Sequence, residues 1–259
     1  MWQVLTNKIR KAFSDAADRY DILTTLHKEI GRELVKKTVR LDADRILDVG
    51  CGTGYVANKA KFFFPESTII GLDIAEGMLK KAQALHEGVP LFWLQADAEA
   101  LPLKAQAFEL VLSNLAYQWV GQLPRAFSEA YRVLTPKGQL FMTMFGQRTC
   151  EELFNVLTHC ASGKAVSFSR LPSIEQVKDA LQQAGFDNAS VDYELIKVQF
   201  RDVLELLGWL KGLGANHLGG DFFLGKDMLA RVDKYYRDQF PYYDGISASF
   251  EVIWVNAQK

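Results

Sequence analysis

Hydrophobic residues in this chain follow two patterns that alternate along the sequence. Short apolar runs are typical of buried strands in a parallel sheet, whereas apolar residues three or four positions apart predict amphipathic helices. The runs that predict strands lie at residues 45–49, 68–72, 91–95, 108–112, 139–145, 191–200 and 246–254. The stripes that predict helices lie at residues 56–64, 78–85, 123–134, 153–157 and 174–184. Because strand–helix–strand crossovers are right-handed, the pattern predicts a parallel α/β sheet that binds ligands at the carboxyl edge of its strands.

The last predicted strand and the segment before it differ from this alternation. Apolar residues from Ile246 to Trp254 alternate with Ser247, Ser249 and Glu251, which predicts a strand with one buried face and one exposed face. Residues 201–245, which precede it, are far more than a hairpin requires. They predict a helical insertion with helices at 203–213 and 227–240.

Length and composition indicate one globular domain. The chain has 259 residues, of which 49% are hydrophobic, enough for one large α/β domain with insertions and too few for two. The net charge of -1 argues against nucleic acid as a partner, and no apolar run is long enough to span a membrane. Three cysteines without C-x-x-C spacing and four scattered histidines predict neither a disulfide framework nor a metal site. These features predict a cytoplasmic protein.

Three glycines directly after the first strand mark the candidate ligand site. The strand ends in Asp48, and Gly50, Cys51, Gly52 and Gly54 follow before a helix resumes. Glycine permits a sharp turn and close approach of the backbone to a ligand, and the first turn of the helix leaves backbone N–H groups available. The same glycine pattern also matches a loose dinucleotide-binding motif. The glycines alone therefore leave open whether the ligand is a nicotinamide cofactor or another adenosine-bearing molecule.

Two further acids stand at the ends of the next two strands. Asp73 ends the second strand, about twenty residues after the turn, a distance at which a carboxylate meets ribose hydroxyls. Asp97 follows the third strand. Carboxylates near a pyrophosphate would repel it, which disfavours a dinucleotide, although a single aspartate can also be a simple strand-end cap.

This spacing of a glycine turn and three acids resembles the class I S-adenosylmethionine-dependent methyltransferases. The resemblance implies that residues 50–54 line the methionine part of the cofactor, that Asp73 binds the ribose hydroxyls, and that Asp97 contacts the adenine amine. It also implies a seven-stranded, mostly parallel, Rossmann-like sheet with helices on both faces and a reversed last strand. The positions that the resemblance assigns to the cofactor, S-adenosyl-L-methionine, are Asp48, Gly50, Cys51, Gly52, Gly54, Asp73, Ile74, Met78, Asp97, Ala98 and Asn114.

The first forty residues are predicted to be helical, because Ile22, Leu26, Ile30 and Leu34 repeat every four positions. Residues 9–21 resemble the amino-terminal flap that many small-molecule methyltransferases fold over the cofactor, which implies that Tyr20 lies near the transferred methyl group. The alternative is that this stretch is an ordinary core helix. The expected organisation is a single domain 1–259, with the flap at 1–40, the cofactor core at 41–145, a lid segment at 146–172 and the helical substrate-lid insertion at 201–245.

A narrower resemblance covers most of the chain. The segment Ser113-Asn114-Leu115-Ala116 with Gln118-Trp119, and Gly214-Ala215 in the insertion, are similar to the malonyl-acyl carrier protein O-methyltransferases of biotin synthesis. The Pro-Pro-Tyr sequence of amino-group methyltransferases is missing from the first segment. The resemblance implies methylation of the free carboxylate of a malonyl thioester, carried by acyl carrier protein or by coenzyme A.

A carboxylate substrate requires orientation more than it requires a base, because it is already ionised at neutral pH. A bidentate arginine is suited to this task. The candidates for catalysis are therefore Arg148 and Arg170 after the fifth strand, with Tyr20 as a hydroxyl donor. The acidic carrier protein would require a positive rim, which Arg231, Lys234 and Arg237 could supply; a solvated helix face explains the same three residues without a function.

Other functions remain open at the level of sequence. A class I enzyme that methylates carbon or nitrogen on a quinone or another small metabolite shares the glycine turn and Asp73. A non-catalytic cofactor-binding protein would also retain these residues. A nicotinamide dehydrogenase is disfavoured by the three acids.

Overall fold

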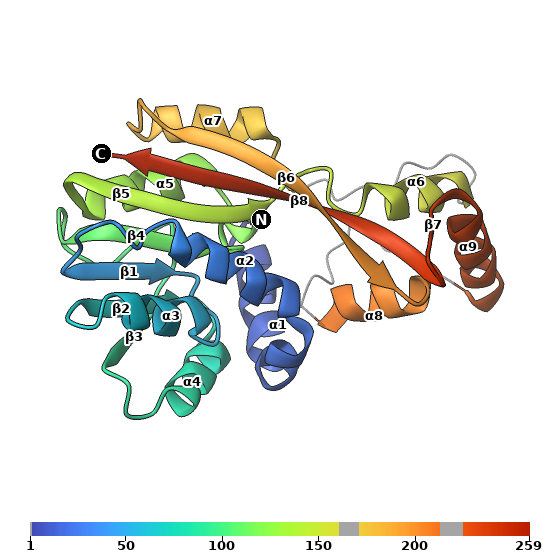
Figure 1. The fold of residues 1–259 in the computed structure, drawn as a ribbon, viewed down its shortest axis with the longest axis horizontal. Coiled ribbons are helices and arrows are strands. Elements are labelled where there is room, and N and C mark those ends of the chain that lie inside the picture. The colour runs from blue at the N-terminus through green and yellow to red at the C-terminus, as the bar shows by residue number, and fades with distance from the viewer. Residues whose placement is uncertain (1, 161–170, 213–224) are drawn as a thin grey trace. The chain divides into compact units, whose positions relative to one another are not determined.

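The computed structural model describes residues 2–160, 171–212 and 225–259 of the chain (Figure 1). These residues form two compact units that the chain enters more than once. The first unit comprises residues 1–144, 174–192 and 253–259, and the second comprises 145–173 and 193–252. The described residues of both predicted lid segments belong to the second unit. Their action as lids and the single-domain organisation stay predictions.

The first unit contains the cofactor core predicted from the sequence. Its helices are α1 (Trp2–Leu23), α2 (Thr25–Lys36), α3 (Tyr55–Phe63), α4 (Glu76–Leu85), α5 (Leu123–Val133), α7 (Ile174–Gln183) and the short 3-10 helix η1 (Tyr117–Trp119). Its strands are β1 (Arg45–Val49), β2 (Thr68–Asp73), β3 (Leu91–Gln95) and β4 (Phe108–Asn114). Three longer strands pass from one unit into the other, namely β5 (Leu134–Phe145), β6 (Ser190–Phe200) and β8 (Gly245–Gln258).

The strands form one sheet in the order β3-β2-β1-β4-β5-β8-β6. Pairing is parallel from β3 through β5, with Ile46 of β1 opposite Ile69 of β2 and Leu110 of β4. The arrow of β8 points opposite to that of β5 (Figure 1). The predicted seven-stranded, mostly parallel sheet with a reversed last strand is confirmed, and a two-residue strand, β7 (Pro241–Tyr242), pairs with β8 in addition.

Helices cover both faces of the sheet, as predicted. On one face, Leu47 and Val49 of β1 pack in a core with Phe127 of α5 and Leu181 of α7. On the other face, Ile46 packs in a second core with residues of α2 and α3. Because successive side chains of a strand point to opposite faces, a strand that is covered on both sides favours apolar residues on both. This is why Ile46, Leu47 and Val49 of β1 are all apolar, whereas the buried Asp48 belongs to the candidate site at the end of the strand.

The boundary between α5 and β5 differs from its prediction. The sequence predicts a helix through residue 134 and a strand from 139, whereas α5 ends at Val133 and β5 begins at Leu134. Pro136 has no N–H to donate and is tolerated in a strand where the ladder is irregular. The pairing of β4 with β5 shifts register between Phe108 and Leu110, and Lys137 has a positive φ of 68°. The proline therefore lies in an irregular strand start instead of ending the helix.

The second unit is built from α6 (Glu151–Cys160), α8 (Val203–Gly212), α9 (Lys226–Gln239) and parts of the long strands. The prediction that β8 has an exposed polar face is wrong, because Ser247, Ser249 and Glu251 are all buried. The segment after β5 covers that face. The backbone N–H of Ser249 donates to the Glu152 carboxylate at 3.0 Å, and the Glu251 carboxylate accepts from the backbone N–H of Arg148 at 2.9 Å. The alternation of apolar and polar residues predicted the strand correctly, but the polar face of β8 is buried against hydrogen-bonding partners in the segment after β5.

No helix within the described residues is long and apolar enough to cross a membrane.

Candidate active site

The glycine turn connects the end of β1 to α3, and three of its residues have backbone angles that favour glycine. Gly50, Gly52 and Gly54 have φ values of 70°, 53° and 83°. The backbone N–H groups of Gly50 and Cys51 both donate to the carbonyl of Leu72, at 2.7 and 2.9 Å, and so fix the turn against β2. A Cβ atom on Gly50 would lie 2.2 Å from that of Ala116, so no larger residue fits there.

Asp48 lies buried beneath this turn. Its Oδ2 accepts a hydrogen bond from the backbone N–H of Ala57 at 3.0 Å, in the first turn of α3, where such groups otherwise have no partner. Its Oδ1 is buried and has no hydrogen-bond partner among the described residues. Burial raises the pKa of Asp48 to about 7, against the lowering effect of the Ala57 N–H, and the charge of Asp73 adds to the rise. The site therefore has an unused acceptor suited to a cationic or hydrogen-bond-donating ligand group.

Asp73 ends β2 and faces the cavity. Its two oxygens accept hydrogen bonds from the backbone N–H groups of Gly52, at 2.9 Å, and Ala75, at 2.8 Å. Burial raises the pKa of Asp73 above its ordinary value, while these N–H groups act in the opposite direction. A carboxylate offers about four acceptor positions, so two remain for the hydroxyls of a ligand.

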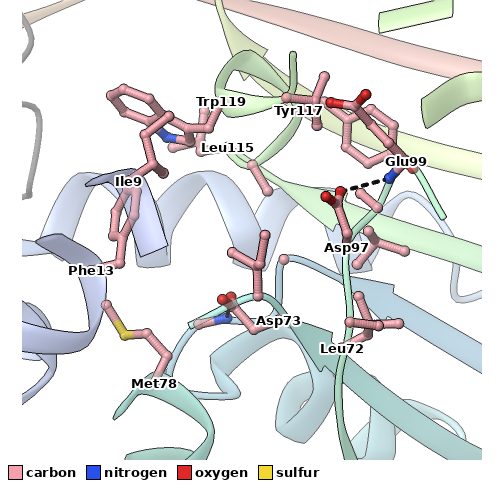
Figure 2. A pocket seen from close by; sticks show the side chains of 18 of the residues that line it. Ile9, Phe13, Leu72, Asp73, Met78, Asp97, Glu99, Leu115, Tyr117 and Trp119 are labelled. Carbon is pink, nitrogen blue, oxygen red and sulfur yellow. Dashed lines mark hydrogen bonds between the residues drawn. The ribbon is translucent and has the colours of Figure 1, made fainter. Parts of the chain in front are cut away.

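Asp97, after β3, is fixed by a residue that the sequence did not single out. Its Oδ1 accepts from the backbone N–H of Glu99 at 2.9 Å (Figure 2). The Glu99 carboxylate in turn accepts from the backbone N–H groups of Gly121 and Gln122 in the segment after η1. Glu99 thus ties two loops of the cavity together. Its position two residues after a strand-end acid was the available signal.

These residues line one cavity of the first unit. Figure 2 shows Ile9 and Phe13 of α1, Met78 of α4, and Trp119 of η1 around the two aspartates. The predicted site residues that line it are Tyr20, Gly50, Gly52, Asp73, Ile74, Met78, Asp97, Ala98 and Asn114. Those that the prediction missed include Ile9, Phe13, Leu72, Glu99, Leu115, Tyr117 and Trp119.

A smaller cavity lies behind the turn and accounts for two more predicted residues. Asp48 and Cys51 line it together with Thr24 and Lys28, and Tyr20 contributes to both cavities. Gly54 lines neither. A Cβ there would lie 2.4 Å from the Trp93 ring, so its role in the structure is to let β3 and the turn pack closely.

Helix α1 forms one wall of the main cavity and is fastened to the glycine turn. The Oδ1 atom of Asp21 accepts from the hydroxyl of Thr53 at 3.2 Å and pairs with Lys28 of α2 at 2.8 Å. Tyr20, the residue before it, faces the cavity. Burial and the charges of Asp73 and Asp21 raise the pKa of Tyr20 above its ordinary value, so its phenol stays protonated and acts as a hydrogen-bond donor.

Asn114 lines both cavities, but its amide is used by the fold. Its Nδ2 donates to the carbonyl of His27 at 3.0 Å, and its Oδ1 accepts from the Thr143 hydroxyl at 2.8 Å. The side chain thereby joins α2 to β4 and β5. Contact between Asn114 and a cofactor stays a prediction.

Of the two predicted arginines, only Arg148 is among the described residues. Arg148 lies in the second unit, where its backbone N–H donates to Glu251 and its half-exposed side chain pairs with Glu151 at 3.5 Å. Arg170 lies outside the described residues. Of the three catalytic candidates, only Tyr20 is placed in the cavity.

The predicted basic rim on α9 is partly neutralised. Arg237 pairs with Asp233 at 2.9 Å and donates to the carbonyl of Arg201 at 2.7 Å. Arg231 and Lys234 are exposed. The solvated-face interpretation therefore fits Arg237.

The lining of the main cavity defines what it can do. Its described lining residues include three carboxylates and two phenols but no histidine, lysine or cysteine. No group of histidine, cysteine and acidic residues that could hold a metal is found among the described residues. The cavity suits a ligand with an aromatic ring, hydroxyls and positive charge, and the carboxylates that could act as general bases already accept hydrogen bonds from backbone N–H groups.

Comparison with known proteins gives consistent results. A family model described as a methyltransferase domain matches residues 47–142. A malonyl-[acyl-carrier protein] O-methyltransferase of a Methylovorus species is 34% identical over 97% of this chain and 88% of that protein. A bifunctional biotin biosynthesis protein of Teredinibacter turnerae is 31% identical, over 97% of this chain and 46% of its own length. The crystal structure of the YcgJ protein of a Bacillus species has a TM-score of 0.64 at 19% identity, covering 88% of this chain and 97% of that one, which supports the fold.

Proposed function

The chain belongs to the malonyl-[acyl-carrier protein] O-methyltransferase family, and from this premise we propose that it methylates the free carboxylate of a malonyl thioester in biotin synthesis. The methyl donor is S-adenosylmethionine. The product is a neutral methyl ester, which fatty-acid-type elongation can accept. The acidic acyl carrier protein is the proposed carrier of the malonyl group, and malonyl-coenzyme A is a second candidate.

The residues of the first unit fit the proposed donor. Asp73 retains free acceptor positions for ribose hydroxyls, and Asp97 lies at the next strand end for the adenine amine. The unpartnered Oδ1 of Asp48 is suited to the ammonium group of the methionine part. Gly50 and Gly52 leave the turn without side chains that would occupy this space. When bound, S-adenosylmethionine supplies a methyl group on a positively charged sulfur.

One observation favours a carboxylate as the acceptor of the methyl group. Among the described lining residues of the cavity there is no histidine, lysine or cysteine, and the raised pKa of Tyr20 keeps its phenol protonated. The three carboxylates of the lining accept backbone hydrogen bonds, and two of them, Asp73 and Asp97, are assigned to the donor. A phenol or an ammonium substrate would have to lose a proton to become a nucleophile. A carboxylate is already ionised and needs only to be oriented.

We assign this orientation to Tyr20, Arg148 and Arg170. The Tyr20 hydroxyl would donate a hydrogen bond to the substrate carboxylate, and the arginines would bind it from the segment after β5. An arginine stabilises the charge of the bound carboxylate, which is lost as the ester forms. Removal of an arginine should therefore raise KM more than it lowers kcat.

The proposal is tested by incubating the protein with methyl-labelled S-adenosylmethionine and a panel of malonyl thioesters, quinone precursors and amines. We expect label only in the malonyl thioesters. Label in a quinone precursor or an amine would favour the carbon or nitrogen methyltransferase alternative. Tight donor binding without label in any substrate would indicate a cofactor-binding protein without catalytic activity.

A further inference from the structure

Three exposed cations lie on the amino-terminal half of α1, the helix that forms one wall of the main cavity. They are Lys8, Arg10 and Lys11. None of them has an ion pair with another described residue. The first acidic residue of the whole sequence is Asp15. This part of α1 therefore presents a local excess of positive charge on a protein whose net charge is -1.

The acids farther along α1 do not cancel this charge, because they have cations of their own. Asp18 pairs with Lys81 of α4 at 3.1 Å. Asp21 pairs with Lys28 of α2 at 2.8 Å. Asp15 is the one acid of α1 without an ion pair among the described residues. Lys8, Arg10 and Lys11 therefore outnumber the unpaired acids of this helix.

The cations adjoin residues that line the cavity. Ile9 and Phe13, four positions apart, lie on the same face of α1, and both line the cavity (Figure 2). Lys8 and Arg10 precede and follow Ile9, so each lies about 100° around the helix from it. An apolar centre with a charged rim is the usual composition of a protein interface.

Helix α9, the rim predicted from the sequence, is less suited to bind an acidic surface. Its exposed cations, Lys226, Arg231 and Lys234, share the helix with Asp227, Asp233 and Asp238. Acidic residues on a docking surface repel an acidic partner. The cations of α1, in contrast, have no acidic neighbour in the sequence before Asp15.

We propose that the amino-terminal half of α1, with Lys8, Arg10 and Lys11, is the docking surface for the acidic carrier protein that delivers the malonyl thioester. This assignment rests on the proposed function. Docking here places the carrier next to Ile9 and Phe13, at the wall of the cavity that receives the donor. The attraction increases the rate of productive encounter and has no part in the methyl transfer.

The test compares two substrates with the same reacting group. One is the malonyl carrier protein, and the other is malonyl N-acetylcysteamine thioester, which has no carrier and no carrier charge. In the variant Lys8→Glu/Arg10→Glu we expect kcat/KM for the carrier substrate to fall about 10- to 100-fold, with less than about twofold change for the small thioester. The salt dependence of the carrier reaction should also weaken in this variant.

A matched control is the variant Arg40→Glu/Lys104→Glu, which reverses one arginine and one lysine at exposed positions outside both cavities. It should affect neither substrate. An equal loss on both substrates in the α1 variant, or a loss confined to Arg231→Glu/Lys234→Glu, would overturn the assignment. Binding of the wild type to phosphatidylserine vesicles, lost in the α1 variant while carrier turnover is unchanged, would show a membrane surface instead. If the wild type methylates neither malonyl substrate, the proposed function itself fails.

Discussion

Asp73 forms two hydrogen bonds within the protein in addition to its predicted contact with the donor. Its carboxylate accepts from Gly52 and Ala75 and so holds the glycine turn against the end of β2. A structural role and a ligand role therefore coincide in one side chain. A substitution at this position has to be judged by donor affinity and by stability together.

The variant Asp73→Asn keeps one acceptor oxygen for the turn but loses the charge that strengthens hydrogen bonds to ribose hydroxyls. Hydrogen bonds to a charged group contribute about 1.5–3 kcal/mol, so the donor affinity measured by calorimetry should fall about 10- to 100-fold. The exposed Asp42→Asn is the control and should bind normally. Unchanged affinity in Asp73→Asn, with an unchanged melting temperature, would remove Asp73 from the donor site.

Asp48 predicts a pH dependence of donor binding. Burial raises its pKa to about 7, well above its ordinary value. If its unpartnered Oδ1 receives the ammonium group of the donor, binding favours the ionised carboxylate and expels a proton below pH 7. Affinity should therefore rise by about tenfold in total between pH 6 and 8.

Calorimetry in buffers of different ionisation enthalpy measures this proton release. Asp48→Asn should bind more weakly and without the pH dependence. The same pKa shift acts on stability with the opposite trend. The folded protein holds the proton more tightly than the unfolded chain, so Asp48 lowers the free energy of unfolding as pH rises from about 4 to 7. A wild-type affinity that does not change with pH would contradict the ammonium assignment.

At the scale of elements, the cavity depends on how closely α1 packs on α4. A Cβ on Gly77, at the start of α4, would lie 2.6 Å from the carbonyl oxygen and 2.8 Å from the Cα of Ser14. The Gly77 backbone N–H also donates to the Ser14 hydroxyl at 3.3 Å. The two helices therefore approach closely only because this position has no side chain.

Gly77→Ala should push α1 away from α4, because the clash is with backbone atoms that cannot rotate aside. We expect a loss of about 1–3 kcal/mol in stability and weaker donor binding, measured by thermal unfolding and calorimetry. Gly208→Ala in α8 is the matched control, since a Cβ there meets nothing within 4 Å. Alanine should be favourable by about 0.5–1 kcal/mol at that helical position. Equal behaviour of the two variants would show that α1 has room to shift.

At the scale of the whole molecule, the sequence predicted the structure best in segments whose residue types are set by a single factor, such as burial on both faces of the sheet. The apolar run of β1 and the stripe of α5 predicted a parallel sheet covered on both faces, because burial on both sides favours apolar side chains at successive positions of a strand. The meeting of strand-end acids at one edge of the sheet follows from a second simple rule. Parallel strands bring their carboxyl ends to one edge, where Asp73 and Asp97 line one cavity.

The sequence was least informative where distant segments meet. Burial of Ser249 and Glu251 depends on Glu152 and on the backbone of Arg148, about a hundred positions away, so alternation alone suggested an exposed face. Trp119 enters the cavity from the short helix η1, whose conformation no local pattern encodes, and the only local signal for Glu99 was its position after Asp97. The role of Arg148 toward a substrate stays a prediction.

The central claim is that the methyl group is transferred to a carboxylate oxygen, and the position of the methyl group in the product tests it most directly. The protein is incubated with methyl-labelled S-adenosylmethionine and a malonyl thioester, and the product is treated with mild base. A methyl ester releases its label as volatile methanol, which is the predicted result. Label that stays on carbon after base treatment, or no labelled product at all, would contradict the account.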